Sequence, residues 1–129
     1  MKLTKEDKEL IRKSESLENP KKVIGGEIKE VGSALITQKG NIFTGANMDL
    51  YTAVGFCAER SAISNMVSHS NETQIKTIVA TGFGKIMPPC GCCREMMELI
   101  NKKNRDETWV IISKSKKVKL KELLPNSWL

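Results

Sequence analysis

The sequence predicts an α/β fold, in which helices and strands form packed layers. Two observations support this prediction. Short apolar runs rich in β-branched residues, at Ile75 to Ala80 and Trp109 to Ile112, are typical of buried strands. Segments with apolar residues at helical spacing alternate with these runs along the chain. The chain has 129 residues and no visible repeat or linker, so we expect residues 1–129 to form one domain.

The N-terminal part is predicted to form a helix followed by a β-hairpin. Thr4 is a candidate N-cap, and Asp7 stands at capping-box spacing from it. A strand is expected from Val31 to Thr37, a turn over residues 38–41, and a returning strand from Ile42 to Gly45. Two strands around a short polar turn are the pattern of a hairpin.

Two further helices are predicted in the second half of the chain. One runs from Cys57 to about His69, and the other, after two prolines, from about Cys90 to Lys102. Val118 and Leu120 are expected in a last strand, at the edge of the sheet. Both cysteine motifs therefore fall at helix N-termini, where the positive end of the helix dipole favours thiolates.

The composition is typical of an ordinary globular chain, with 40% hydrophobic and 28% charged residues. No apolar run approaches membrane-spanning length, and the N-terminus lacks the apolar segment of a secretory signal, so we expect a cytoplasmic protein without membrane contact. The net charge of +6 is interpreted as a solvated, lysine-rich surface. The densest basic stretch, Lys114 to Lys119, has none of the aromatic residues of single-strand platforms, so nucleic-acid binding is not predicted.

Three cysteines and one glutamate carry the chemistry. The first motif is Cys57-Ala58-Glu59, and the second is Pro89-Cys90-Gly91-Cys92-Cys93. In the reducing cytosol this pattern favours a metal site over disulfides. Three thiolates around tetrahedral Zn²⁺ leave its fourth position for water, which is typical of a catalytic site. Glu59 is placed to move the protons of that water, as in the signature of zinc deaminases.

Cys92 and Cys93 compete for one ligand position. Residues i and i+3 of a helix share a face and residues i and i+2 do not, so Cys93 is predicted to join Cys90, and Cys92 to pack under the helix. The only histidine, His69, lies about 18 Å along the helix axis from Cys57, too far to bind the same metal, and is expected to be exposed.

Two arginines follow the cysteines closely. Three thiolates with Zn²⁺ carry a net negative charge, which would raise the pKa of a bound water. A guanidinium that donates to the sulfurs offsets this charge. Arg60 and Arg94 are both candidates, and we favour Arg60.

These motifs resemble the small, tetrameric cytidine deaminase family, which includes blasticidin-S deaminases. The similarity rests on residues 57–63 (CAERSAI) and 89–94 (PCGCCR), and extends from about Val31 to Pro125. The resemblance implies a three-layer α/β/α fold with a five-stranded mixed sheet. It implies Zn²⁺ on Cys57, Cys90 and Cys93, Glu59 as proton shuttle, and a homotetramer.

The resemblance also implies contacts to a nucleoside substrate. Asn47 matches the asparagine that binds the ribose, and Asp49 stands where the family has a glutamate, one methylene longer. The backbone N–H of Ala58 and the carbonyl of Pro88 are expected to orient the base. The aromatic residue that stacks on the pyrimidine is absent from residues 28–30. Trp128 is expected either to line the substrate site, as an aromatic does in blasticidin-S deaminases, or to pack on the body of the domain.

The sequence therefore predicts a hydrolytic zinc deaminase that converts cytidine-type nucleosides to uridine-type products and ammonia. The same chemistry on blasticidin S or another aminated heterocycle is the first alternative. A zinc-stabilised binding protein without turnover is the second, although Glu59 has no purpose in a closed structural site. A thiol redox protein that uses Cys90 and Cys93 is the third, but it leaves Cys57-Ala58-Glu59 unexplained.

Overall fold

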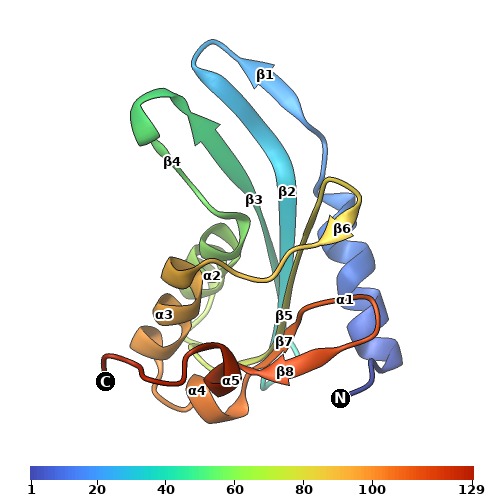
Figure 1. Cartoon of the computed structure of the whole chain (residues 1–129), viewed down its shortest axis with the longest axis vertical. Coiled ribbons are helices and arrows are strands. Elements are labelled where there is room, and N and C mark those ends of the chain that lie inside the picture. The colour runs from blue at the N-terminus through green and yellow to red at the C-terminus, as the bar shows by residue number, and fades with distance from the viewer.

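A computed structural model describes residues 1–129 as a mixed β-sheet with helices on both faces (Figure 1). The helices are α1 (Lys5–Ser16), the 3-10 helix η1 (Tyr51–Ala53), α2 (Ala58–His69), α3 (Gly91–Ile100), α4 (Asn104–Glu107) and α5 (Leu120–Leu123). The strands are β1 (Lys21–Val23), β2 (Gly26–Thr37), β3 (Ile42–Leu50), β4 (Gly55–Phe56), β5 (Ile75–Gly82), β6 (Lys85–Ile86), β7 (Trp109–Ile111) and β8 (Lys117–Lys119). None of the helices is long and apolar enough to cross a membrane.

The sheet has eight strands, and its main path runs in the order β4-β3-β2-β5-β7-β8. β1 pairs with β2, and β6 pairs with β5, outside this path. Only β5 and β7 are parallel, and all other pairs are antiparallel. The predicted α/β class and mixed sheet are confirmed, but the number of five strands is wrong. The additional strands β1, β4 and β6 are only two or three residues long, and each returns along a longer neighbour.

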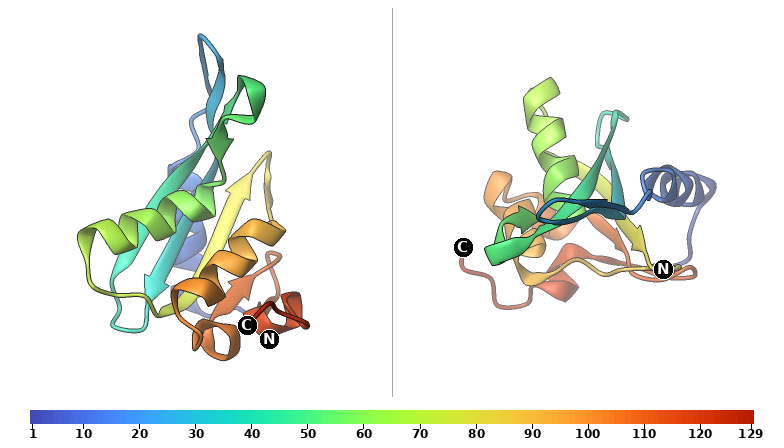
Figure 2. Two further views of the ribbon diagram at one scale, coloured as in Figure 1. Left: turned by 90° about the vertical axis from the view of Figure 1, so that its left-hand side faces the viewer. Right: turned by 90° about the horizontal axis from the view of Figure 1, so that it is seen from above.

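Two hydrophobic cores lie on opposite faces of the sheet. α1 packs against β2 and β5 on one face, and α2 and α3 cover the other (Figures 1 and 2). Successive side chains of a strand point to opposite faces. In β2, Leu35 therefore joins Met66 in the core beneath α2 and α3, whereas Ala34 and Ile36 join Leu10 in the core beneath α1.

Local sequence patterns located most elements correctly. α1 has the predicted capping box, in which Thr4 Oγ1 accepts from the Asp7 N–H and Asp7 Oδ2 accepts from the Thr4 N–H. The hairpin of β2 and β3 is longer than predicted at both outer ends. β8 is the expected edge strand, but Leu120 begins α5 instead of extending the strand, and its side chain is fully buried.

Gly45 allows α2 to approach β3 closely. A Cβ atom at this position would lie 2.6 Å from Ser61 Oγ and closer still to the backbone nitrogen of Ala62. These two residues belong to the first turns of α2, directly after Cys57 and Glu59. The absence of a side chain at Gly45 therefore sets the distance between the sheet and the helix that carries the first cysteine motif.

The outer parts of β2 and β3, together with β1, η1 and β4, project beyond the helices (Figure 1). We call this projecting part the arm. Its large, exposed hydrophobic side chains are Val23, Ile24, Met48, Tyr51, Val54 and Phe56. A group of apolar side chains this exposed is typical of a surface that contacts another molecule or a ligand.

Gly45→Ala should destabilise the protein by about 1–3 kcal/mol, because the added methyl forces α2 away from β3. The free energy of unfolding, measured by urea denaturation, checks this. Gly25→Ala is the matched control, since the atom nearest to a Cβ there lies 4.0 Å away, on the Tyr51 ring. Equal stability of the two variants would contradict the role assigned to Gly45.

Candidate metal centre and adjoining cavity

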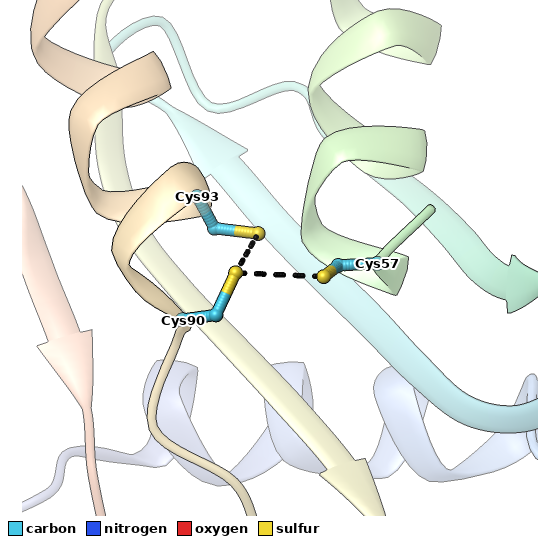
Figure 3. A group of neighbouring side chains, drawn as sticks. All are labelled: Cys57, Cys90 and Cys93. Atoms are coloured by element: carbon cyan, nitrogen blue, oxygen red, sulfur yellow. Dashed lines mark hydrogen bonds between the residues drawn. The ribbon is translucent and has the colours of Figure 1, made fainter. Parts of the chain in front are cut away.

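The starts of α2 and α3 bring three cysteines together (Figure 3). Cys57 is the N-cap of α2, Cys90 is the N-cap of α3, and Cys93 lies in the first turn of α3. The Sγ atom of Cys90 lies 3.5 Å from that of Cys57 and 3.4 Å from that of Cys93, and all three Sγ atoms lie within 4.8 Å of one another. The three side chains point toward one another from two helices.

The spacing of the sulfurs fits a zinc ion. Zn–S bonds of about 2.3 Å in a tetrahedron place the sulfurs about 3.8 Å apart, close to the separations found here. Burial raises the pKa of the Cys57 and Cys93 thiols. Burial acts in the same direction on Cys90, but hydrogen bonds with Cys93, Cys57 and the Cys92 backbone together outweigh it and lower the pKa of Cys90. A soft, all-sulfur donor set of this kind suits Zn²⁺.

Cys92 does not pack under the helix as predicted. Its side chain is exposed, whereas that of Cys93 is buried. The i, i+3 argument correctly separated the two residues, but nothing covers the side of the first turn of α3 to which Cys92 points. His69 is exposed near the end of α2, as predicted, and its Nδ1 atom lies 3.0 Å from the Asn65 carbonyl oxygen.

Glu59 and Arg60 lie in the first turn of α2, next to the sulfurs. Glu59 is only 6% exposed, although it lines a cavity, and burial raises the pKa of its carboxyl group. Arg60 Nη2 donates to Cys57 Sγ at 3.7 Å, so its positive charge lies beside the sulfur cluster. Arg94 instead donates to the carbonyls of Pro89 and Leu123, and so connects the loop before Cys90 to the C-terminal segment.

A cavity of about 440 Å³ adjoins the cysteine cluster. Its wall includes Cys57, Cys90, Glu59 and four of the five predicted substrate-contact residues, Asn47, Asp49, Ala58 and Pro88. Asn47 is fixed in place, because its Oδ1 atom accepts a hydrogen bond of 3.0 Å from the Val31 N–H. The structure therefore gathers residues from β2, β3, α2 and the loop before α3 around one space.

Trp128 does not line this cavity in the chain, nor does it pack on the body of the domain. Its side chain is 80% exposed at the C-terminal end. The expectation that Trp128 packs on the body of its own domain is therefore wrong, whereas a contact of Trp128 with the substrate site stays a prediction, since a neighbouring copy of the chain can complete that site.

Sequence reasoning missed two aromatic residues of the cavity wall, Phe56 and Phe83. Phe56 directly precedes Cys57, and Phe83 lies in the turn between β5 and β6. The one signal in the sequence was the run Gly82-Phe83-Gly84, in which two glycines mark a tight turn around an aromatic residue.

Two helix starts on one face of a mixed sheet bring three cysteines together, two of them in the wall of an open cavity, and this arrangement is suited to a zinc site. Residues 4–105 match the model of the cytidine and deoxycytidylate deaminase zinc-binding region, and the chain belongs to this family. The family assigned from the two cysteine motifs is thus confirmed, and with it Zn²⁺ as the cofactor.

Individual relatives agree with this assignment. The chain is 32% identical over 69 residues to a cytidine deaminase of Halalkalibacterium halodurans. This match covers 53% of this chain and 52% of that protein. It is 36% identical over 67 residues to a probable cytidine deaminase of Dictyostelium discoideum, and this match covers 50% of this chain and 46% of that protein. The chain therefore matches about half the length of these curated relatives.

The fold also matches a crystal structure of cytidine deaminase from Burkholderia pseudomallei, with a TM-score of 0.71 at 22% identity. The match covers 98% of this chain and 100% of that chain. At this identity the likeness concerns the fold, and it extends over α1 and the C-terminal elements as well as the cysteine motifs.

The purified protein should contain close to one zinc ion per chain, measured by plasma emission spectrometry. Cys57→Ala, Cys90→Ala and Cys93→Ala should each lose most of it, because each removes one of three converging sulfurs. Cys92→Ala is the matched control and should retain zinc, since the Cys92 side chain is exposed. Zinc loss in Cys92→Ala with retention in Cys93→Ala would overturn the proposed ligands.

Proposed function

We propose that the protein is a zinc-dependent hydrolytic deaminase that converts cytidine-type nucleosides to uridine-type products and ammonia. The observation that carries this proposal is the position of Glu59. Its carboxyl group is buried at the wall of an open cavity. Glu59 follows Cys57 by two residues, and the Cys57 sulfur lies in one cluster with those of Cys90 and Cys93. A cluster of three sulfurs with a carboxylate beside it suits hydrolysis better than structural metal binding.

Zinc held by Cys57, Cys90 and Cys93 would lower the pKa of water to about 7 and so make a nucleophile available at neutral pH. Glu59 takes the proton of the attacking water on its carboxylate and delivers it to ring N3 of the substrate. As this proton moves, the water oxygen bonds to C4. Glu59 then takes the remaining proton from the new C4–OH group and gives it to the amino group, so that the C4–N bond breaks, ammonia leaves and a C4 carbonyl forms. Burial raises the pKa of Glu59, which suits a group that must both accept and return protons.

Other residues of the wall would hold the base and balance charge. We assign the Ala58 N–H and the Pro88 carbonyl to hydrogen bonds with the base, because both residues lie in the cavity wall beside the cysteines. Arg60, which donates to Cys57 Sγ, offsets the negative charge of three thiolates. This arrangement keeps the base in one orientation relative to Glu59.

We assign recognition of the sugar to Asn47 and Asp49, which lie two residues apart on β3. The Val31 N–H fixes Asn47 through Oδ1, which leaves the amide N–H groups of Asn47 available to a hydroxyl of the substrate. Asp49 is exposed, and its carboxylate is one methylene shorter than glutamate. The short Asp49 carboxylate also leaves room in the cavity for a substrate with a bulkier group in place of the sugar. Blasticidin S or another aminated heterocycle is therefore the second candidate substrate.

We further propose a cytoplasmic homotetramer. The exposed hydrophobic side chains of the arm, and of Trp128, favour burial against other copies of the chain. Four free cysteines, three of them in one cluster, suit a reducing compartment. Light scattering measures the mass in solution directly.

Glu59→Ala should retain zinc and lose turnover of cytidine by at least roughly 10²–10⁴-fold, the contribution of general acid–base catalysis. Ammonia release and zinc content, measured on the same sample, check this. Glu95→Ala is the matched control, because Glu95 lies on α3 outside the cavity wall. Turnover of Glu59→Ala within about tenfold of wild type would remove Glu59 from the mechanism.

Cytosine without its sugar should be a poorer substrate than cytidine, because the amide N–H groups of Asn47 would be left without a hydrogen-bond acceptor in the substrate. An unpaired buried amide costs about 1–3 kcal/mol, so Asn47→Ala should reduce the cytidine preference in kcat/KM by roughly 5- to 150-fold. Asn71→Ala, an exposed position, is the control. An unchanged ratio in Asn47→Ala would show that the sugar is recognised elsewhere.

A further inference from the structure

Phe83 stands in a tight turn that favours other residues. Thr81 pairs with Ile86 and Gly82 with Lys85, so the hairpin of β5 and β6 has a loop of two residues, Phe83 and Gly84. Their φ angles are 53° and 75°. Positive φ at both loop positions is the mark of a type I′ turn, for which Asn-Gly is the preferred pair. A bulky side chain at positive φ is a strained outlier.

Packing within the chain does not explain this strain. The Phe83 side chain is 67% exposed, so it contributes little to either hydrophobic core. A strained residue that persists without a packing reason points to a function at that position. Phe83 is moreover part of the cavity wall, together with Met87 and Pro88, which follow β6.

The β5–β6 turn borders the cavity, since Phe83 is part of its wall. Figure 1 shows the β5–β6 hairpin rising beside β2. The cavity wall continues on the arm with residues such as Val54 and Phe56. An aromatic ring on this turn therefore borders the same space as Cys57, Cys90 and Glu59.

We propose that Phe83 is a specificity-determining residue, whose ring stacks on the planar heterocycle of the substrate. The proposal rests on the proposed function, since it names the wall against which the base lies. Stacking on an aromatic ring requires only a π-face, so Phe83 would favour flat heterocycles without choosing among their polar groups. A ring without charge or proton contributes equally to bound substrate and transition state, so its loss should appear in KM and not in kcat.

Phe83→Asn tests this with a substitution that the turn favours. It should raise the midpoint of thermal unfolding by about 2–6 °C, because asparagine relieves the strain at positive φ. It should also weaken binding of uridine, the product, by roughly 5- to 150-fold, the range of base–aromatic stacking, and raise the KM for cytidine similarly. Phe83→Tyr, which keeps the ring, should bind uridine like wild type.

Thr52→Asn is the matched control. Thr52 also has positive φ, 60°, and is exposed, but it is not part of the cavity wall. It should gain thermal stability without a change in uridine binding. Calorimetric titration of the zinc-loaded protein with uridine gives the dissociation constants, and ammonia release gives KM and kcat.

Three results would overturn the proposal for Phe83. The first is that Phe83→Asn binds uridine like wild type, and the second is that it loses kcat with no change in uridine binding. The third is that Phe83→Asn has a smaller mass than wild type by light scattering, which would place Phe83 in a contact between subunits. A wild-type protein that releases no ammonia from cytidine overturns the proposed function instead. An active wild type with an unaffected Phe83→Asn variant overturns only the role of Phe83.

Discussion

The site depends on one geometric constraint, which is that α2 and α3 begin side by side on the same face of the sheet. Cys57 and Cys90 are 33 positions apart in the sequence, yet each is the residue that starts its helix, and their sulfurs lie 3.5 Å apart. The helix dipoles therefore place two positive ends at one point, where thiolates are stabilised. The close approach of α2 to β3 at Gly45, and the shared core of Met66 and Met97, hold this arrangement.

The same constraint creates an electrostatic conflict that a cation resolves. Glu59 is buried beside the sulfurs, and its charge raises the pKa of Cys93 further than burial alone. Arg60 contributes the one positive side chain that donates to a sulfur. A divalent ion among the three sulfurs would compensate for the remaining negative charge, because metal binding requires the thiols to be deprotonated. With a metal ion present, the buried negative charge of Glu59 beside the sulfurs is compensated, and the burial on which its proposed role as proton carrier depends does not destabilise the fold.

Local sequence patterns correctly predicted those structural features that are determined by residues close together in the chain. The capping box of Thr4 and Asp7, the two helix starts and the pairing of Cys90 with Cys93 all follow from spacing of one to three residues. Features that depend on distant parts were missed or wrong. Cys92 is exposed because no other element covers the first turn of α3, and the Trp128 side chain is exposed instead of packed on the domain. Phe83 reaches the cavity only because β5 turns back as β6, which two residues of strand do not reveal.

The central claim is that three sulfurs hold zinc and leave one position open. X-ray absorption at the zinc edge of the purified, zinc-loaded protein tests this most directly, because it counts the atoms around the metal by type. We expect three sulfurs at about 2.3 Å and one lighter atom, oxygen or nitrogen, at about 2.0–2.2 Å. Four sulfurs would mean that Cys92 closes the site, and would contradict a metal centre able to carry out hydrolysis.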